Sequence, residues 1–134
     1  MTDFSADKWC FVCGADNPIG FCQEFFEDED GYYTTVVFKR EHQGYMGIVH
    51  GGLTATLLDE VMARLVWEKA GPAATARIEV NYRKPIETGI PIRFTAKISN
   101  IRREGKIYET TGKAILPDGT VAADAVATVV CVKR

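Results

Sequence analysis

Residues 51–69 carry the only convincing helical pattern in the sequence, and this one helix limits the possible folds more than any other feature. The segment is mostly apolar and runs into Ala70-Gly71-Pro72, the usual order of residues at a helix stop. The sequence that follows alternates apolar and polar residues with period two, which is typical of strands. A chain with one apolar helix and many strands buries that helix against its sheet.

Strand-like segments lie on both sides of the helix. We predict strands at 21–27, 32–39, 77–83, 92–98, 106–116 and 121–132, joined mostly by short turns. In the first strand after the helix, Ile78, Val80 and Tyr82 face one way, and Arg77, Glu79, Asn81 and Arg83 face the other. The last strand is apolar on both faces, as expected if other subunits or a second sheet cover it. The sequence therefore predicts an α+β fold, with an antiparallel sheet wrapped around one long helix.

Length and composition place this fold in one domain. With 134 residues, 46% of them hydrophobic, we expect an N-terminal appendage at 1–18 and a single domain at 19–134. The net charge of −2 gives no reason to expect nucleic acid as a partner. No apolar run approaches the ~20 residues of a membrane span, and the first residues lack the pattern of a secretory signal. The expected location is the cytoplasm.

Cys10 and Cys13 form a C-x-x-C pair, which suggests either a redox site or half of a zinc site. The sequence contains no second pair, and only His42 and His50 are available as imidazole ligands. We therefore expect a turn with reduced thiols, no metal and no bound cofactor.

The start of the helix has features suited to acyl chemistry. It follows His50-Gly51-Gly52, and the first backbone N–H groups of a helix bind negative charge because they have no partner within the helix. Asp59 lies two turns further along, where a carboxylate can act as base or nucleophile. Together these features suggest acyl transfer.

Asp59 and its neighbour Glu60 are expected to have different surroundings. Asp59 shares its helix face with small or apolar residues, namely Gly52, Ala55, Thr56, Ala63 and Val66. Glu60 lies with Arg64 and Glu68 at i, i+4 spacing, which predicts a solvated ladder of ion pairs. The alternative for Asp59 is a structural hydrogen bond to a loop or to another subunit.

These elements resemble the hotdog-fold thioesterases, in particular the phenylacetyl-CoA-type and human-type acyl-CoA thioesterases. The resemblance rests on His50-Gly51-Gly52 with Asp59 seven residues after Gly52, on residues 81–85, and on the opening residues 10–20, and it covers roughly residues 20–132. It implies hydrolysis of acyl-CoA in a homodimer or a dimer of dimers. It also implies active sites at the interface between subunits. The alternatives are an acyl-CoA-binding module without turnover and a hydratase of the same fold.

The resemblance also implies roles for individual residues. Asp59 would be the general base or the nucleophile. The Gly51 N–H would donate to the thioester oxygen, and Gly52 would contact the substrate next to it. His50 would orient the loop or contact the thioester, and Thr75 would position the attacking water. The alternative for the two glycines is close packing alone, and for Thr75 it is strand propensity.

One loop position departs from the family pattern. Many relatives carry an amide fifteen residues before the acid, where this chain has Gly44, with Gln43 one residue earlier. Gln43 is therefore a candidate to contact substrate. Arg83 and Lys84 are candidates for the phosphates of CoA, although exposed basic residues at strand ends are often only solvated.

Overall fold

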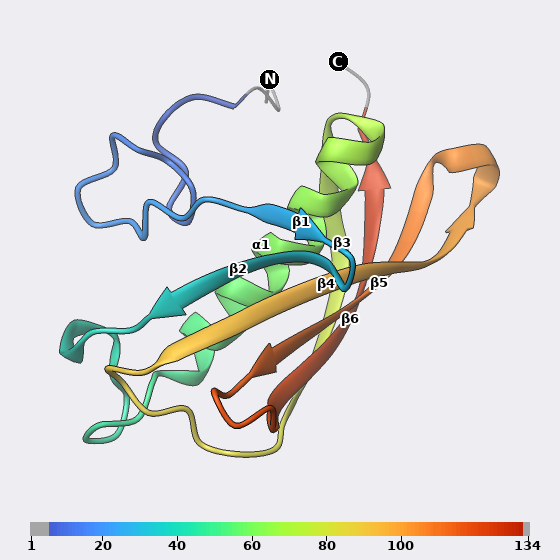
Figure 1. Ribbon diagram of the computed structural model, residues 1–134. Helices are drawn as coiled ribbons and strands as arrows, with labels where there is room; N and C mark the ends of the chain where they lie inside the picture. Colours follow the sequence, from blue (N-terminus) through green and yellow to red (C-terminus); the bar gives the residue numbers. More distant parts are fainter. Residues whose placement is uncertain (1–5, 133–134) are drawn as a thin grey trace.

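The computed structural model describes residues 6–132, in which one long helix packs against one face of a six-stranded antiparallel sheet (Figure 1). The elements are β1 (Phe26–Asp28), β2 (Gly31–Val37), η1 (Arg40–His42), α1 (Gly51–Ala70), β3 (Ala73–Tyr82), β4 (Pro91–Arg102), η2 (Arg103–Gly105), β5 (Ile107–Ile115) and β6 (Val121–Cys131). The strand order is β1-β2-β4-β5-β6-β3. This arrangement confirms the predicted α+β class and the sheet wrapped around a helix. None of the helices in the described range has the length and apolar composition needed to cross a membrane.

The helix α1 is held by an apolar face that packs directly on the sheet. Its fully buried side chains include Leu57, Leu58, Val61, Met62 and Val66, and burial of each large one contributes ~1.5–3 kcal/mol. Gly112 of β5 lies beneath Met62, where a Cβ would come within 3.2 Å of the methionine sulfur. The absence of a side chain at 112 therefore lets the helix approach the sheet closely.

The predicted strand at 21–27 is wrong over most of its length, because only Phe26–Asp28 joins the sheet as β1. The preceding residues pair instead with the N-terminal segment, where Phe21 N–H donates to Phe11 O at 2.9 Å and Gln23 N–H donates to Val12 O at 2.8 Å. Cys22 between them adopts a left-handed φ of 51°. This conformation interrupts the extended geometry that a regular strand requires.

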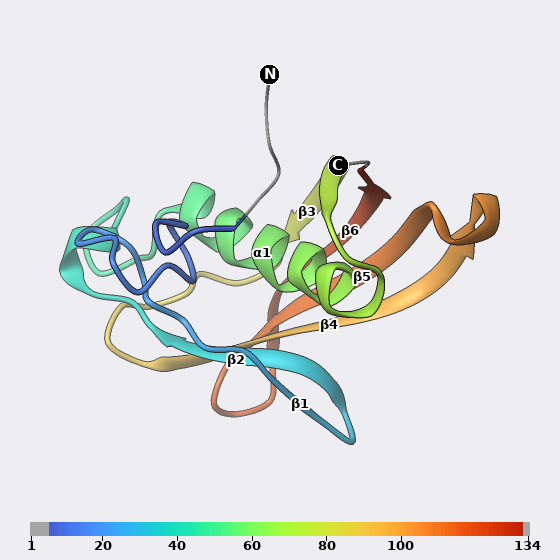
Figure 2. The ribbon, with the colours of Figure 1, turned by 90° about the horizontal axis from the view of Figure 1, so that it is seen from above.

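The N-terminal segment packs on the same side of the sheet as α1 (Figure 2). Val12 is only 3% exposed and belongs to the main core. The ring of Phe11 meets that of Phe21 edge to face, with centroids 5.4 Å apart. These contacts attach the segment to the domain. The proposed division at residue 18 stays a prediction.

The free edge of the sheet beyond β6 belongs to β3. Residues 78, 80 and 82 share one face, as predicted, and this face is on the helix side, where the Tyr82 hydroxyl donates to Gly51 O at 2.7 Å. However, α1 does not cover them fully: Ile78 is 36% exposed and Tyr82 57% exposed. The apolar last strand, β6, lies inside the sheet between β5 and β3. The long edge strand available for pairing with another chain is therefore β3, because the other edge is the three-residue β1.

Candidate functional site

The start of α1 presents one backbone donor with no acceptor among residues 6–132. His50 is the N-cap, and its Nδ1 accepts a hydrogen bond from Gly52 N–H at 3.0 Å. The N–H groups of Leu53 and Thr54 point back to His50 O. The Gly51 N–H has no recorded partner in this part of the chain. A carbonyl oxygen that reaches the helix start can therefore take this position without displacing an existing bond.

The two glycines at the helix start differ in how closely the chain packs around them. A Cβ on Gly52 would lie 3.2 Å from His50 Nδ1, so a side chain there would disturb the cap. A Cβ on Gly51 would lie 3.5 Å from the nearest ring atom of Tyr82, which is an ordinary van der Waals contact. Packing within the chain therefore explains glycine at 52. It does not explain glycine at 51.

Gly51 borders a hollow of about 340 Å³ between the helix start and the segment after β3. Lys84 and Arg83, the candidates for contact with the CoA phosphates, also border it. Arg83 already pairs with Asp124, which raises the pKa of the Arg83 guanidinium through its hydrogen bond and charge. Among the described residues, Lys84 has no carboxylate within ion-pair distance. Lys84 is therefore the better placed of the two cations for an incoming anion.

Asp59 lies elsewhere, in a larger cavity of about 590 Å³ between α1, the start of β3 and the N-terminal segment. The Thr75 hydroxyl donates to Asp59 Oδ1 at 2.7 Å, and both residues are half-buried. Thr75 precedes an irregularity in the pairing of β3 with β6, between residues 75 and 77. The contact fixes the orientation of the carboxylate, which lines this cavity together with Ala63 and Ala73.

The donor and the carboxylate do not share a cavity within one chain. Gly51 and Asp59 are eight residues apart on α1, which is ~12 Å along a helix axis. The two hollows have no lining residue in common. A substrate atom held by Gly51 is therefore too far away for attack by the Asp59 of the same chain.

The predicted solvated ladder of Glu60, Arg64 and Glu68 is wrong. Glu60 and Arg64 are half-buried, Glu68 is exposed, and no ion pair joins the three side chains in the described chain. The Tyr32 hydroxyl donates to Glu68 Oε1 at 3.0 Å and accepts from Arg64 Nε at 3.1 Å. The guanidinium of Arg64 also lies 5.1 Å from the Phe25 ring centroid. Strand β2 and the N-terminal segment thus cover this side of the helix.

Glu60 faces the cysteine pair, a contact that the sequence analysis did not foresee. The Cys10 thiol donates to Glu60 Oε2 at 3.6 Å, and Cys10, Cys13 and Glu60 place their sulfur and oxygen atoms within 4.8 Å of one another. Burial raises the pKa of Glu60, while hydrogen bonds from the two thiols partly oppose that shift.

His42 does not belong to this cluster, because its ring lies 4.6 Å from that of Phe21. Burial there lowers the pKa of His42.

Gln43 closes its own loop. Its Oε1 accepts from Gly47 N–H at 3.0 Å. At the next position, a Cβ on Gly44 would lie 3.3 Å from the Cα of His50, so this loop passes directly beside the helix start. A role for Gln43 toward substrate stays a prediction.

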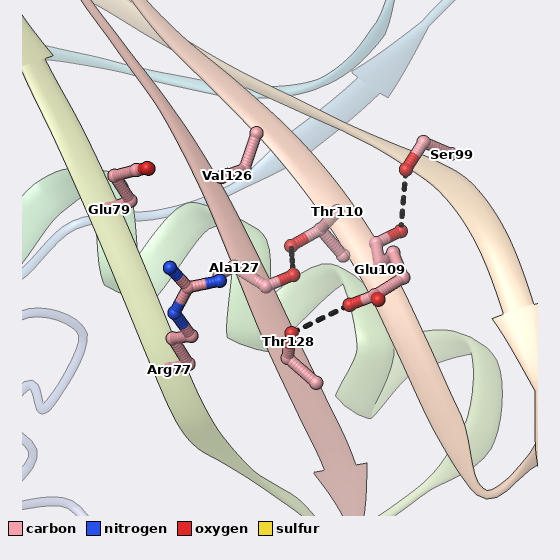
Figure 3. A pocket seen from close by; sticks show the side chains of 8 residues that line it. All are labelled: Arg77, Glu79, Ser99, Glu109, Thr110, Val126, Ala127 and Thr128. Carbon is pink, nitrogen blue, oxygen red and sulfur yellow. Dashed lines mark hydrogen bonds between the residues drawn. The ribbon is translucent and has the colours of Figure 1, made fainter.

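A further hollow, of about 220 Å³, lies on the outer face of β3, β6 and β5, away from α1 (Figure 3). Its polar groups bond to one another: Thr128 Oγ1 donates to Glu109 at 2.6 Å, and Thr110 Oγ1 donates to Ala127 O at 3.1 Å. Arg77 and Glu79 border it from β3. It contains none of the predicted site residues.

Comparisons with known proteins agree on one family. The model described as "Thioesterase superfamily" matches residues 46–109, which include the helix start and Asp59. Human acyl-coenzyme A thioesterase 13 is 36% identical over 75 residues, 54% of this chain and 51% of that protein. The chain thus spans about half the length of this relative.

Solved structures extend the likeness over most of the chain. A crystal structure described as a thioesterase superfamily protein superposes with a TM-score of 0.80 at 28% identity, covering 92% of this chain and 60% of that one. A protein of Bacillus halodurans, solved with CoA, gives a TM-score of 0.74 at 25% identity, covering 85% of this chain and 76% of that one. The first match extends beyond the region that the family model covers.

Proposed function

The chain belongs to the thioesterase superfamily, with the hotdog fold, and from this premise we propose that it hydrolyses acyl-CoA thioesters to a free acid and CoA. The observation that carries the proposal is the Gly51 N–H, which has no partner within residues 6–132, on the same helix as Asp59, whose carboxylate accepts from Thr75 of β3. The first element suits a thioester oxygen and the second suits its attacker. The Bacillus halodurans structure with CoA supports this substrate class.

In the proposed reaction, Gly51 N–H donates to the carbonyl oxygen of the thioester. This hydrogen bond becomes stronger as negative charge develops on that oxygen, and one such donor lowers the barrier by ~3–4 kcal/mol. Gly52 N–H already bonds to His50, so the proposed role of His50 is to keep the helix start in this geometry. Lys84, at the same hollow, is the proposed contact for a CoA phosphate.

Asp59 acts either as general base or as nucleophile. As base, it takes a proton from water while the water oxygen bonds to the acyl carbon, and the C–S bond breaks to release CoA. As nucleophile, its oxygen first bonds to the acyl carbon while the C–S bond breaks and CoA leaves as the thiolate. Water then hydrolyses the resulting anhydride, which releases the acid and regenerates the Asp59 carboxylate. In both routes Thr75 orients the attacking group, because its hydroxyl is 2.7 Å from Asp59 Oδ1.

A panel assay tests the proposal. We expect the purified chain to release free thiol from at least one class of acyl-CoA, aliphatic or aromatic, detected with a thiol reagent. No metal or cofactor is added. Binding of acyl-CoA by calorimetry with no thiol release across the panel would assign the chain to non-catalytic binding instead.

We further propose that the active site forms between two copies of this chain. The distance between Gly51 and Asp59 along α1 requires the two groups to come from different chains if they are to meet one substrate. The uncovered edge of β3, with Ile78 and Tyr82 partly exposed, offers the surface for a symmetric pairing. Tyr45 and Met46, 86% and 91% exposed beside the helix start, are further apolar surface for a second chain to cover.

Mixing two inactive variants tests this arrangement directly. Asp59→Asn and Gly51→Pro chains are each expected to form inactive homodimers. A hybrid dimer would contain one site with both substitutions and one native site. After unfolding and refolding an equal mixture, activity should return to about a quarter of wild type, since half of the dimers are hybrid and each has one native site of two. No recovery, with hybrids verified by two different affinity tags, would place the whole site in one chain.

A further inference from the structure

We propose that Cys10, Cys13 and Glu60 bind a zinc ion that holds the N-terminal segment on α1. The proposal replaces the sequence-based expectation of no metal, and it does not depend on the proposed hydrolysis. The sequence alone indicates only half of a site, because it contains one pair of sulfur ligands, Cys10 and Cys13, and no second pair. The structure supplies the third ligand from the middle of the helix, fifty residues away from Cys10 in the chain.

The distances fit tetrahedral zinc. Zinc lies about 2.3 Å from a thiolate and about 2.0–2.2 Å from a carboxylate oxygen, so a tetrahedral S···O edge is ~3.5–3.7 Å. Cys10 Sγ and Glu60 Oε2 are 3.6 Å apart. All three ligand atoms lie within 4.8 Å of one another, and all three residues are half-buried.

The loop that carries the cysteines is built as a tight turn. Cys13 N–H donates to Cys10 Sγ at 3.5 Å, and Gly14 N–H donates to Cys10 O at 2.8 Å. A Cβ on Gly14 would lie only 2.4 Å from Cys10 N, so glycine is required to close the turn. The turn therefore presents both sulfurs on one side and directs them toward Glu60.

The charges also suit a divalent cation. Zinc would displace the two thiol protons to solvent and leave two thiolates and one carboxylate around a 2+ ion. The resulting net charge is −1. Arg64, which interacts electrostatically with both Cys13 and Glu60, stands beside the cluster to balance it.

Three protein ligands leave a fourth coordination position. Cys10, Cys13 and Glu60 all border the cavity of about 590 Å³ that also contains Asp59. Water can therefore complete the tetrahedron.

Metal analysis of the full chain is the test. After chelation and dialysis under reducing conditions, the wild-type protein should take up one Zn²⁺ per chain and release protons in a weakly buffered solution. Co²⁺ in its place should give thiolate charge-transfer absorption together with the intense visible bands of tetrahedral coordination. A zinc content well below one per chain, or a cobalt spectrum without thiolate bands, would overturn the proposal. So would formation of a Cys10–Cys13 disulfide in a protein that still takes up no zinc after reduction.

Variants locate the ion. Cys10→Ser and Cys13→Ser should each weaken zinc binding beyond the ~10–100-fold that loss of an outer-shell contact costs, and Glu60→Gln should abolish the tetrahedral cobalt spectrum. Cys22→Ser is the matched control, because Cys22 is exposed and outside the cluster. Zinc should raise the melting temperature of the wild type and of Cys22→Ser, and not that of the ligand variants. Equal zinc affinity in Cys10→Ser and Cys22→Ser would exclude the site.

Discussion

Replacing Asp59 with asparagine is expected to lower kcat on the best acyl-CoA substrate by ~10²-fold or more, the low end of the loss when a general base is removed. The asparagine keeps the shape of the side chain, and its amide oxygen can still accept from Thr75. It can neither take a proton from water nor attack as an anion. Steady-state kinetics should show the loss in kcat, while binding of a non-hydrolysable acyl-CoA analogue, followed by calorimetry, stays close to wild type.

The matched control for this experiment is Glu104→Gln, which also neutralises one carboxylate. Glu104 is exposed in η2, in the turn between β4 and β5, and borders neither hollow near α1. Glu60→Gln, which the sequence pattern suggested as a harmless change, is unsuitable because Glu60 is half-buried beside Cys10. Near-native kcat in Asp59→Asn would refute the role of Asp59.

Replacing Gly51 with proline is expected to lower kcat by ~10²–10³-fold, the usual loss when one oxyanion donor is removed. Proline lacks the N–H but fits the first position of a helix, where no hydrogen bond within the helix is lost. His50 has φ −59° and ψ 129°, an extended conformation that a following proline favours. Circular dichroism should show an intact fold, and kinetics should show the loss.

Gly51→Ala separates the donor from the space around it. Alanine keeps the N–H and adds only a methyl group, which would make an ordinary contact with the Tyr82 ring. A large loss of kcat in Gly51→Pro together with a small loss in Gly51→Ala would support the role of the Gly51 N–H as a donor. Equal losses of kcat in both variants would mean that the substrate needs the space left by the missing side chain at position 51. A native kcat in Gly51→Pro would exclude the oxyanion role of the Gly51 N–H.

The sequence predicted which segments form the helix and the strands better than it predicted which segments lie next to one another. Helix 51–69 and the period-two strands follow from local patterns, and the structure confirms them. The placement of β6 between β5 and β3 depends on sheet order, which no local pattern contains. The strand predicted from Phe21 fails for a related reason, because Phe21 pairs with Phe11 in the N-terminal segment.

The same limit applies to the site. The family resemblance implied that Asp59 and Thr75 act in one site, and the Thr75 hydroxyl donates to Asp59 Oδ1 at 2.7 Å. The surroundings of Glu60 were misjudged because i, i+4 spacing describes only the surface of the helix itself. What covers that surface is Cys10, a residue fifty positions earlier in the chain. A signal was present in the unexplained C-x-x-C pair, which lacked only a third ligand.

The uncovered edge of β3 also links folding to concentration. Its register with β6 runs from Ala73 to Tyr82, so the outer side of a ten-residue strand offers its N–H and C=O groups to any extended chain. Arg77 and Glu79 put charge on this strand, and the irregularity after Thr75 bends it, and both features disfavour open-ended stacking. For the proposed pairing, a newly made chain must therefore bind a second copy through β3 before its β3 edge pairs with another exposed strand. Protein concentration during synthesis then influences the yield of active protein in addition to the stability of the core.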